Sequence, residues 1–504
     1  MNFLVIDCGT SSCRAVVISG CGKIRSQTRL PIRISRPEPL FAEIDTDDLW
    51  HQVQQLIATE IEKNPGISFD ALGVSAMLGY VFLDKTDTPL MPAIIYSDSR
   101  AVAECEEIRE QIPDKVFYAT TGRRISPFLL APKIRWMAKY RPEIFNRIET
   151  IVGLKDDIVR RLTGQIQTDT AHLDYSGMYN VHQARLDPAL LDALKIGTHL
   201  FPSVNLPTRI AGTLTTDAGK KLKLPPGTPV VTGSTDGTTA MYGAGVLEEG
   251  NAVLVSGTTD VLMLGADRAI DDDTGTLNLN TGILPGTFLV GGPMGSSGGT
   301  LNRFEKMLGS SVNQLAGKIT ALPAGADGLL FFPGLTGERS PYWKAYLTGG
   351  VAGLTATHRK EHLLLAIMEG CAYRLVRLLE ILTQNGLSPR TLTVVGGGAG
   401  NDIWNQIRAD VTGRKVLKPA VTEATSLGTA LFCNAALDTR RTLKEITASW
   451  QADSTRCLPR KNRTAAYRKL AQLFTAYIEN NETLYKRLVS LSRHPGGNEE
   501  WNDR

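Results

Sequence analysis

The sequence lacks the features that mark secreted, zinc-binding and membrane proteins. Its seven cysteines are odd in number and include no CxxC pair, which favours reduced thiols over a disulfide framework or a zinc site. No apolar run approaches the roughly 20 residues that a membrane span requires. No basic segment precedes the short apolar run at the N-terminus. We therefore expect a cytoplasmic protein with no signal peptide and no membrane partner.

An excess of charge of one sign is also missing. The 55 basic and 51 acidic side chains give a formal net charge of +4, which is too even to indicate a nucleic-acid partner. The P-loop pattern GxxxxGK[ST] is absent. The glycine run at 396–400 is not a dinucleotide fingerprint, because its third glycine position holds Asn401. This run instead predicts a turn between a strand and a helix, where bare backbone can approach a flat adenine.

What is present indicates two α/β domains. The chain has 504 residues, more than the about 250–300 that one hydrophobic core supports. Apolar hairpin patterns occur at 3–18 and again at 252–264, and an apolar helical stripe follows a predicted N-cap at Thr46. The predicted layout is a first domain at 1–245, a second at 246–490 and a polar tail at 491–504.

The turns of the two hairpins carry the first candidate chemistry. Thr10, Ser11 and Ser12 combine hydroxyls with the exposed N–H groups of a tight turn, which suits phosphate oxygens, and Arg14 adds positive charge. Ser256–Thr259 offers a second turn of this kind. At the end of the first strand, a carboxylate can hold magnesium directly or through water, and the residue there is Asp7.

A second carboxylate follows a short apolar strand at 230–232. Pro229 suits the first position of this strand because it has no N–H to donate. Asp236 lies in the Gly/Thr-rich stretch after the strand, where it can act as a general base or simply cap a turn. The local sequence leaves both interpretations open.

Taken in order, these motifs resemble the FGGY carbohydrate kinases, which share a fold with actin, hexokinase and the heat-shock ATPases. The opening D-C-G-T-S-S-C-R is similar to the family's D-x-G-T-[ST]-S-x-[KR], and Gly233–Gly237 is similar to its G-[GS]-x-D-[NGQ] loop. Further similar segments lie at 92–100, 121–136, 332–341, 353–370, 396–401 and 423–430. The resemblance implies two ribonuclease-H-like (actin-like ATPase) domains with an interdomain cleft, and ATP and Mg²⁺ as cofactors.

The resemblance also implies roles for individual residues. Asp236 would be the catalytic base, and Asp7 and Asp236 would organise magnesium. The residues implied to contact the nucleotide are Thr10, Ser11, Ser12, Arg14, Thr258, Gly298, Asn302, Gly397 and Asn401.

The expected sugar-binding segment departs from the family pattern. Xylulose kinases typically carry S-G-Q-M-H-G there, whereas residues 75–80 read S-A-M-L-G-Y and lack the usual Gln and His. A pocket with fewer hydrogen-bonding groups disfavours a fully hydroxylated sugar, because buried hydroxyls would stay unpaired. The candidate substrate residues are Met77, Leu78, Tyr80, Asp98, Phe128 and Asp236, and packing of Met77 and Leu78 in the core is an equal alternative.

The sequence therefore predicts an ATP-dependent kinase of a small sugar or polyol, with a pentulose as the leading substrate. A gluconate kinase and an autoinducer-2 kinase remain alternatives, as does an actin-fold ATP-binding protein without sugar kinase activity. Retention of Asp7, Asp236, both phosphate turns and the Glu338-Arg339 pair argues against the last. A homodimer is an open expectation, because dimers are common among similar proteins.

Overall fold

The computed structural model describes residues 1–247, 250–421, 423–450 and 454–492, so the tail predicted at 491–504 lies almost wholly outside the described residues. The chain forms two compact units. Unit 1 comprises 1–248, 265–290 and 423–453, and unit 2 comprises 249–264, 291–422 and 454–504. Because the compact units do not follow chain order, the linear division at 245 stays a prediction.

A six-stranded sheet in the order β13-β14-β5-β1-β2-β3 forms the centre of unit 1. Its strands are β1 (Asn2–Cys8), β2 (Ser12–Ser19), β3 (Ile24–Pro31), β5 (Ala71–Ala76), β13 (Ile210–Thr213) and β14 (Pro229–Thr235). β1 pairs antiparallel with β2 and parallel with β5, which in turn pairs parallel with β14. The predicted N-terminal hairpin and the predicted start of a strand at Pro229 are both confirmed.

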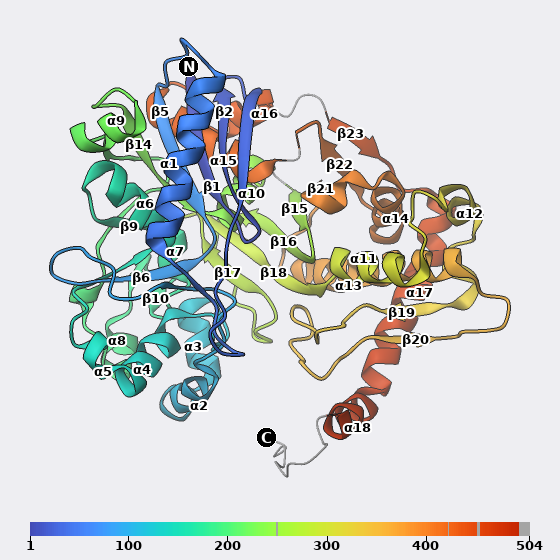
Figure 1. Cartoon of the computed structure of the whole chain (residues 1–504). Coiled ribbons are helices and arrows are strands. Elements are labelled where there is room, and N and C mark those ends of the chain that lie inside the picture. Colours follow the sequence, from blue (N-terminus) through green and yellow to red (C-terminus); the bar gives the residue numbers. More distant parts are fainter. Residues whose placement is uncertain (248–249, 422, 451–453, 493–504) are drawn as a thin grey trace. The chain divides into compact units, whose positions relative to one another are not determined.

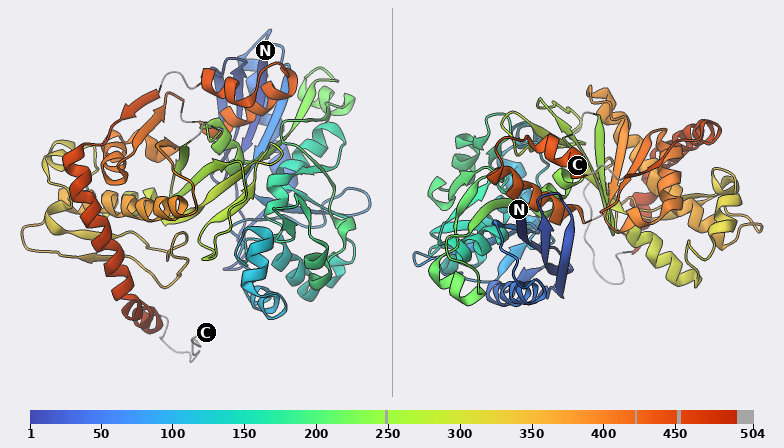
Figure 2. Two further views of the ribbon diagram at one scale, coloured as in Figure 1. Left: turned by 180° about the vertical axis from the view of Figure 1, so that it is seen from behind. Right: turned by 90° about the horizontal axis from the view of Figure 1, so that it is seen from above.

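Helices cover both faces of this sheet. Leu4 and Ile6 of β1 pack in one core with apolar residues of α1 (Thr46–Lys63) and α6 (Leu154–Thr163). On the opposite face, α15 (Ala424–Leu437) crosses β1 and β5, and Gly73 leaves room there for Thr429 and Cys433. Figure 1 and Figure 2 show α15, late in the sequence, beside the N-terminal strands.

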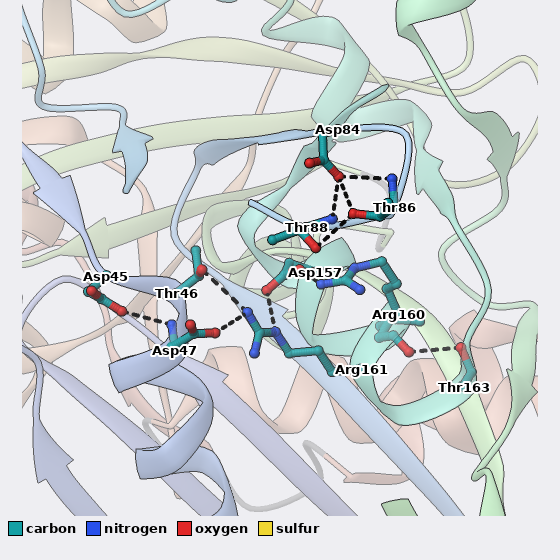
Figure 3. Close-up of polar contacts among 11 residues, drawn as sticks. Asp45, Thr46, Asp47, Asp84, Thr86, Thr88, Asp157, Arg160, Arg161 and Thr163 are labelled. Atoms are coloured by element: carbon teal, nitrogen blue, oxygen red, sulfur yellow. Dashed lines mark hydrogen bonds and ion pairs between the residues drawn. The ribbon is translucent and has the colours of Figure 1, made fainter. Parts of the chain in front are cut away.

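Polar contacts tie α1 to α6 at their ends (Figure 3). Arg161 donates to Asp157 of its own helix at 2.8 Å and to Asp47 of α1 at 2.7 Å. The N-cap prediction at Thr46 is wrong by one residue. Asp45 caps α1 instead and accepts hydrogen bonds from the backbone N–H groups of Asp47 and Asp48, since an aspartate carboxylate can accept from both donors.

Unit 1 also contains a four-stranded sheet in the order β4-β7-β6-β8. Its strands are β4 (Glu43–Ile44), β6 (Gly79–Leu83), β7 (Ala93–Ile95) and β8 (Thr150–Gly153). β6 begins three residues after β5 ends, so the predicted sugar-binding segment connects the two sheets.

Unit 2 repeats the hairpin plan of unit 1. β15 (Asn251–Ser256) pairs antiparallel with β16 (Thr259–Ala266) and parallel with β21 (Thr391–Val395). The ladder continues through β22 (Lys415–Pro419) and β23 (Ser454–Cys457). The helices are α11 (Gly298–Leu308), α12 (Ala316–Ala321), α13 (Lys360–Gln384), α14 (Asp402–Thr412), α17 (Lys461–Asn480) and α18 (Glu482–Ser492). None of the helices in the described part of the chain is long and apolar enough to cross a membrane.

All seven cysteines are free, and Cys21 differs from the others in its surroundings. Its side chain is exposed, and the Ser19 hydroxyl 3.1 Å away lowers the pKa of its thiol. Burial raises the pKa of Cys105 to about 12 and also raises that of Cys371.

We therefore expect Cys21 to react first with a thiol reagent, because the thiolate is the reactive form. One rapid equivalent of Ellman's reagent should be consumed at pH 7, and Cys21→Ser should remove that phase. Cys457→Ser is the control, because burial raises the pKa of this half-buried thiol. A rapid phase that survives in Cys21→Ser would contradict the assignment.

Candidate functional site

Two carboxylates lie at one edge of the large sheet in unit 1. Asp7 is the penultimate residue of β1, and Asp236 directly follows β14 as the first residue of α10 (Asp236–Gly243). Since β1, β5 and β14 are parallel, their carboxyl ends meet at the same edge. Only β5 separates the two strands.

A bulge in β14 sets the position of Asp236. The pairing of β14 with β5 shifts register between Val231 and Ser234. Gly233 lies in this shift with φ +68°, and a Cβ there would sit 1.9 Å from the Val74 carbonyl oxygen. Only glycine tolerates both conditions. The glycine at position 233 is thus required by the geometry of β14, the strand that leads to Asp236.

Both carboxyls have raised pKa values. The pKa of Asp7 is raised to about 7, mainly by burial and then by the charge of Asp236, while Arg14 and Ser75 oppose the shift. The Ser75 hydroxyl donates to Asp7 at 3.3 Å. Part of the Asp236 side chain is accessible. Burial in the protein nevertheless raises the pKa of its carboxyl to about 6, and a 2.7 Å hydrogen bond from the Gly237 N–H opposes this shift. A base with a pKa near 6 is largely deprotonated at neutral pH and can accept a proton there.

This pair of carboxylates fits a magnesium ion. Two like charges within electrostatic reach are stabilised by a divalent cation. Mg²⁺ commonly takes one or two protein carboxylates and completes its shell with water and substrate phosphates. Among the described residues, no group of three or more His, Cys, Asp or Glu side chains is placed to hold a metal ion.

The first phosphate turn lies beside this edge. Thr10 and Ser11 are exposed at its tip, and the Gly9 N–H donates to the Ser12 carbonyl at 3.1 Å. Arg14, on β2, forms an ion pair with Glu423 at the start of α15. The guanidinium is therefore held in place by a carboxylate from far along the chain, a partner that the sequence motif did not reveal.

The predicted substrate residues fall into two groups. Met77 and Leu78 directly follow β5, and the Met77 N–H donates to the Cys8 carbonyl at 2.8 Å. Both side chains are buried in hydrophobic cores, Met77 with residues of β1 and α1 and Leu78 with Tyr80 and Phe82, as the packing alternative expected. Phe128 is half-buried just before α4 (Leu130–Tyr140).

Tyr80 and Asp98 make their hydrogen bonds within the protein. The Tyr80 hydroxyl donates to the Tyr175 carbonyl at 2.8 Å. Asp98 is fully buried, pairs with Arg100 at 2.7 Å and accepts from the Ala42 N–H. These contacts give both side chains a structural role, and their substrate role stays a prediction.

In unit 2, the second phosphate turn packs against the start of α11. The Gly298 N–H donates to the Gly257 carbonyl at 3.1 Å, and the Gly299 N–H donates to the Thr258 carbonyl at 3.0 Å. Thr258 is exposed at the turn, and Asn302 is exposed one helical turn into α11. Three of the predicted nucleotide residues are therefore brought together.

The remaining two predicted nucleotide residues, Gly397 and Asn401, lie on the glycine turn after β21. Gly397 is exposed in that turn, and Asn401 caps α14 by accepting from the Trp404 N–H at 3.0 Å. The turn begins where β21 stops pairing with β15, so it is next to the second phosphate turn.

Buried polar residues beneath these turns were missed by the motif comparison. Asp260 accepts from the Ser297 hydroxyl at 2.8 Å, and Arg374 pairs with Glu338 at 3.0 Å. Arg408 of α14 is fully buried, with its guanidinium over the Trp404 ring. A charged residue on an apolar helix face is a signal that the sequence does contain, because such residues are rarely buried without partners.

The chain matches known proteins along most of its length. Residues 2–243 match the family model described as the FGGY family of carbohydrate kinases, N-terminal domain, and residues 252–437 match its C-terminal domain. A gluconokinase of Bacillus licheniformis is 27% identical over 97% of this chain and 98% of its own length. An L-xylulose/3-keto-L-gulonate kinase of Escherichia coli (strain K12) is 30% identical over 85% of this chain and 87% of its own. A crystal structure of ligand-bound xylulose kinase from Lactobacillus acidophilus superimposes with a TM-score of 0.91 at 24% identity, covering 97% of this chain and 99% of that one.

Proposed function

Because this chain belongs to the FGGY family of carbohydrate kinases, we propose that it transfers the γ-phosphoryl group of ATP to a hydroxyl of a pentulose. The observation that carries the reaction is the position of Asp236. Its partly accessible carboxyl lies at the sheet edge beside Asp7 and has a pKa of about 6. Phosphoryl transfer requires little more than positioning, charge neutralisation and one such base.

In the proposed reaction, deprotonated Asp236 accepts the proton of the sugar hydroxyl. The hydroxyl oxygen forms a bond to the γ-phosphorus while the bond from that phosphorus to the oxygen of the leaving ADP breaks. Asp7 and Asp236 would hold magnesium, which when bound neutralises phosphate charge.

We assign the nucleotide contacts turn by turn. Thr10, Ser11, Ser12 and Arg14 of unit 1 would bind phosphate oxygens through hydroxyls, backbone N–H groups and positive charge. In unit 2, Thr258 and Gly298 would contact the phosphates, and Asn302, Gly397 and Asn401 the nucleoside. The exposure of Thr258 and Gly397 at their turns supports this assignment.

For the sugar, the names of the similar kinases favour a pentulose or gluconate. The side chains of Met77 and Leu78 are buried in hydrophobic cores, so they do not discriminate between these acceptors. The L-xylulose in the name of the 30%-identical relative supports a pentulose as the first acceptor to test. We also propose that the protein is cytoplasmic and forms a homodimer.

The substrate proposal is tested by measuring ADP release with magnesium and ATP against a panel of acceptors. The panel is D-xylulose, L-xylulose, D-ribulose, L-ribulose, gluconate, glycerol, erythritol and the autoinducer-2 precursor. Strong stimulation by one pentulose is the expected result. Stimulation by gluconate alone would replace the proposed acceptor. ATP binding with no stimulation by any compound would favour an ATP-binding protein without sugar kinase activity.

A further inference from the structure

In unit 2, the strand ladder ends just before the proposed nucleotide turns. β15 and β21 pair in parallel up to Val255 and Val395. The next residues are Ser256, which leads into the turn with Thr258, and Gly396, which leads into the turn with Gly397. Beyond the ladder, something other than strand pairing must hold the two turns at a fixed separation.

Arg408 of α14 forms that connection. One terminal nitrogen (Nη2) donates to the Ser256 hydroxyl at 2.6 Å. The other (Nη1) donates to the Gly398 carbonyl at 3.2 Å and to the Asn405 side chain at 3.0 Å. Asn405 in turn donates to the Ala399 carbonyl at 2.8 Å. A single guanidinium therefore reaches the end of β15 directly and the glycine turn both directly and through its neighbour.

The packing around the guanidinium leaves little freedom. Its central carbon lies 4.1 Å from the centre of the Trp404 ring, a favourable cation–π distance. A Cβ on Gly398 would sit 2.2 Å from the Ser256 hydroxyl oxygen. The turn can approach the strand this closely only because residue 398 has no side chain.

The charge of Arg408 is held without a direct carboxylate partner. No ion pair of Arg408 occurs among the described residues, and burial lowers the pKa of its guanidinium while the charge of Asp260 opposes this. Asp260 also accepts from the Ser297 hydroxyl, and the Ser297 N–H donates to the Thr258 carbonyl at 2.9 Å. Arg408, through Ser256, and Asp260, through Ser297, thus both support the phosphate turn that contains Thr258.

We propose that Arg408 is a positioning residue that holds the Thr258 turn and the Gly397 turn at the spacing required to bind one ATP molecule across both. Arg408 is fully buried, so it acts through the turns and not by touching the nucleotide. The planar fork of arginine suits this task, since its separate nitrogens reach two partners in fixed directions, whereas lysine carries its donors on one atom. This inference rests on the proposed assignment of these turns to ATP.

The test is direct binding of ATP and AMP to purified full-length protein by calorimetry, with no sugar present. Arg408→Leu is expected to weaken ATP binding about tenfold, the effect of losing roughly one charge-assisted hydrogen bond. AMP, which would reach the Gly397 turn and Asn302 but not the Thr258 turn, should be affected less. Arg408→Lys should fall between Arg408→Leu and wild type. With an active acceptor, KM for ATP should rise while kcat at saturating ATP changes by less than about twofold.

Arg414→Leu is the matched control. Arg414 follows the same helix and donates to the carbonyls of Pro389 and Thr412, away from both turns, so its loss should leave ATP affinity unchanged. Ser256→Ala removes only the strand end of the connection and should weaken ATP binding even if Arg408→Leu does not fold. Equal ATP affinity of wild type and Arg408→Leu would overturn the proposal. Absence of ATP binding by the wild type would instead overturn the proposed function on which it rests.

Discussion

Asp236→Asn is expected to lower kcat by about a thousandfold, within the range that a general base contributes. The amide has the shape of the carboxyl but cannot accept the proton of the attacking hydroxyl. The affinity for ATP in chelator should change little, because Asp236 is assigned to the acceptor and to magnesium and not to the nucleoside. The measurement is sugar-dependent ADP release at pH 7.5 with the best acceptor, together with the melting temperature to confirm folding.

The matched control is Asp217→Asn. Asp217 is an exposed carboxylate in the first turn of α9 (Thr216–Leu222), as Asp236 is in the first turn of α10. The two variants lose the same charge at equivalent helix positions, so a difference in kcat reports on the site alone. Retention of a tenth or more of the wild-type kcat by Asp236→Asn would remove Asp236 from the role of base.

The pH dependence of kcat/KM is a second test of the role of the Asp236 carboxyl. For wild type, kcat/KM should fall as the pH is lowered through about 6, because protonation of Asp236 removes the proton acceptor. Bound magnesium would move this limb to lower pH, since a cation favours the charged carboxylate. A profile that stays flat down to pH 4 in low magnesium would contradict the raised pKa.

The core of the fold could be predicted from sequence because its pattern is local. The hairpins β1–β2 and β15–β16 each show an apolar run, a small-residue turn and a second apolar run. The membership of α15 in unit 1 could not be predicted in this way. Apolar residues at helical spacing show that a helix is buried, but they do not show which sheet buries it.

The candidate site was predictable to the level of residue type and no further. Asp98 is a candidate substrate residue in the family-like segment 92–100, yet its partners are Arg100 and the Ala42 N–H. Whether a buried carboxylate faces a ligand or an arginine depends on side-chain contacts between distant segments. The same holds for Arg14 and Glu423, which are separated by most of the chain. The order of the motifs indicates the family, whereas these partnerships depend on how the fold brings distant segments together.

Asp7→Asn is expected to stabilise the metal-free protein at pH 8 and to leave its stability unchanged near pH 3. The folded-state pKa of Asp7 is about 7, against an ordinary value of 3.8, mainly because of burial and then the charge of Asp236. The folded state therefore binds a proton more tightly than the unfolded state. From this carboxyl, the free energy of unfolding falls as the pH rises from about 4 to 7 and then levels off. A difference of roughly three pKa units corresponds to at most about 4 kcal/mol, and asparagine, which does not titrate, avoids this loss.

Chemical denaturation of wild type and Asp7→Asn between pH 4 and 8 in chelator measures this difference, with Asp217→Asn as the surface control. Added magnesium should make the wild type more stable than Asp7→Asn. A cation bound by Asp7 and Asp236 offsets their repulsion in the wild type, so added magnesium should stabilise the wild type more than Asp7→Asn. If Asp7→Asn were instead less stable than wild type at pH 8 in chelator, the ionised Asp7 would have to be stabilised by Arg14 more than it is destabilised by burial. Equal stabilisation of both proteins by magnesium would exclude Asp7 as a ligand while leaving the burial argument intact. The two halves of the experiment therefore separate the electrostatic cost of this carboxylate from its assigned role at the metal.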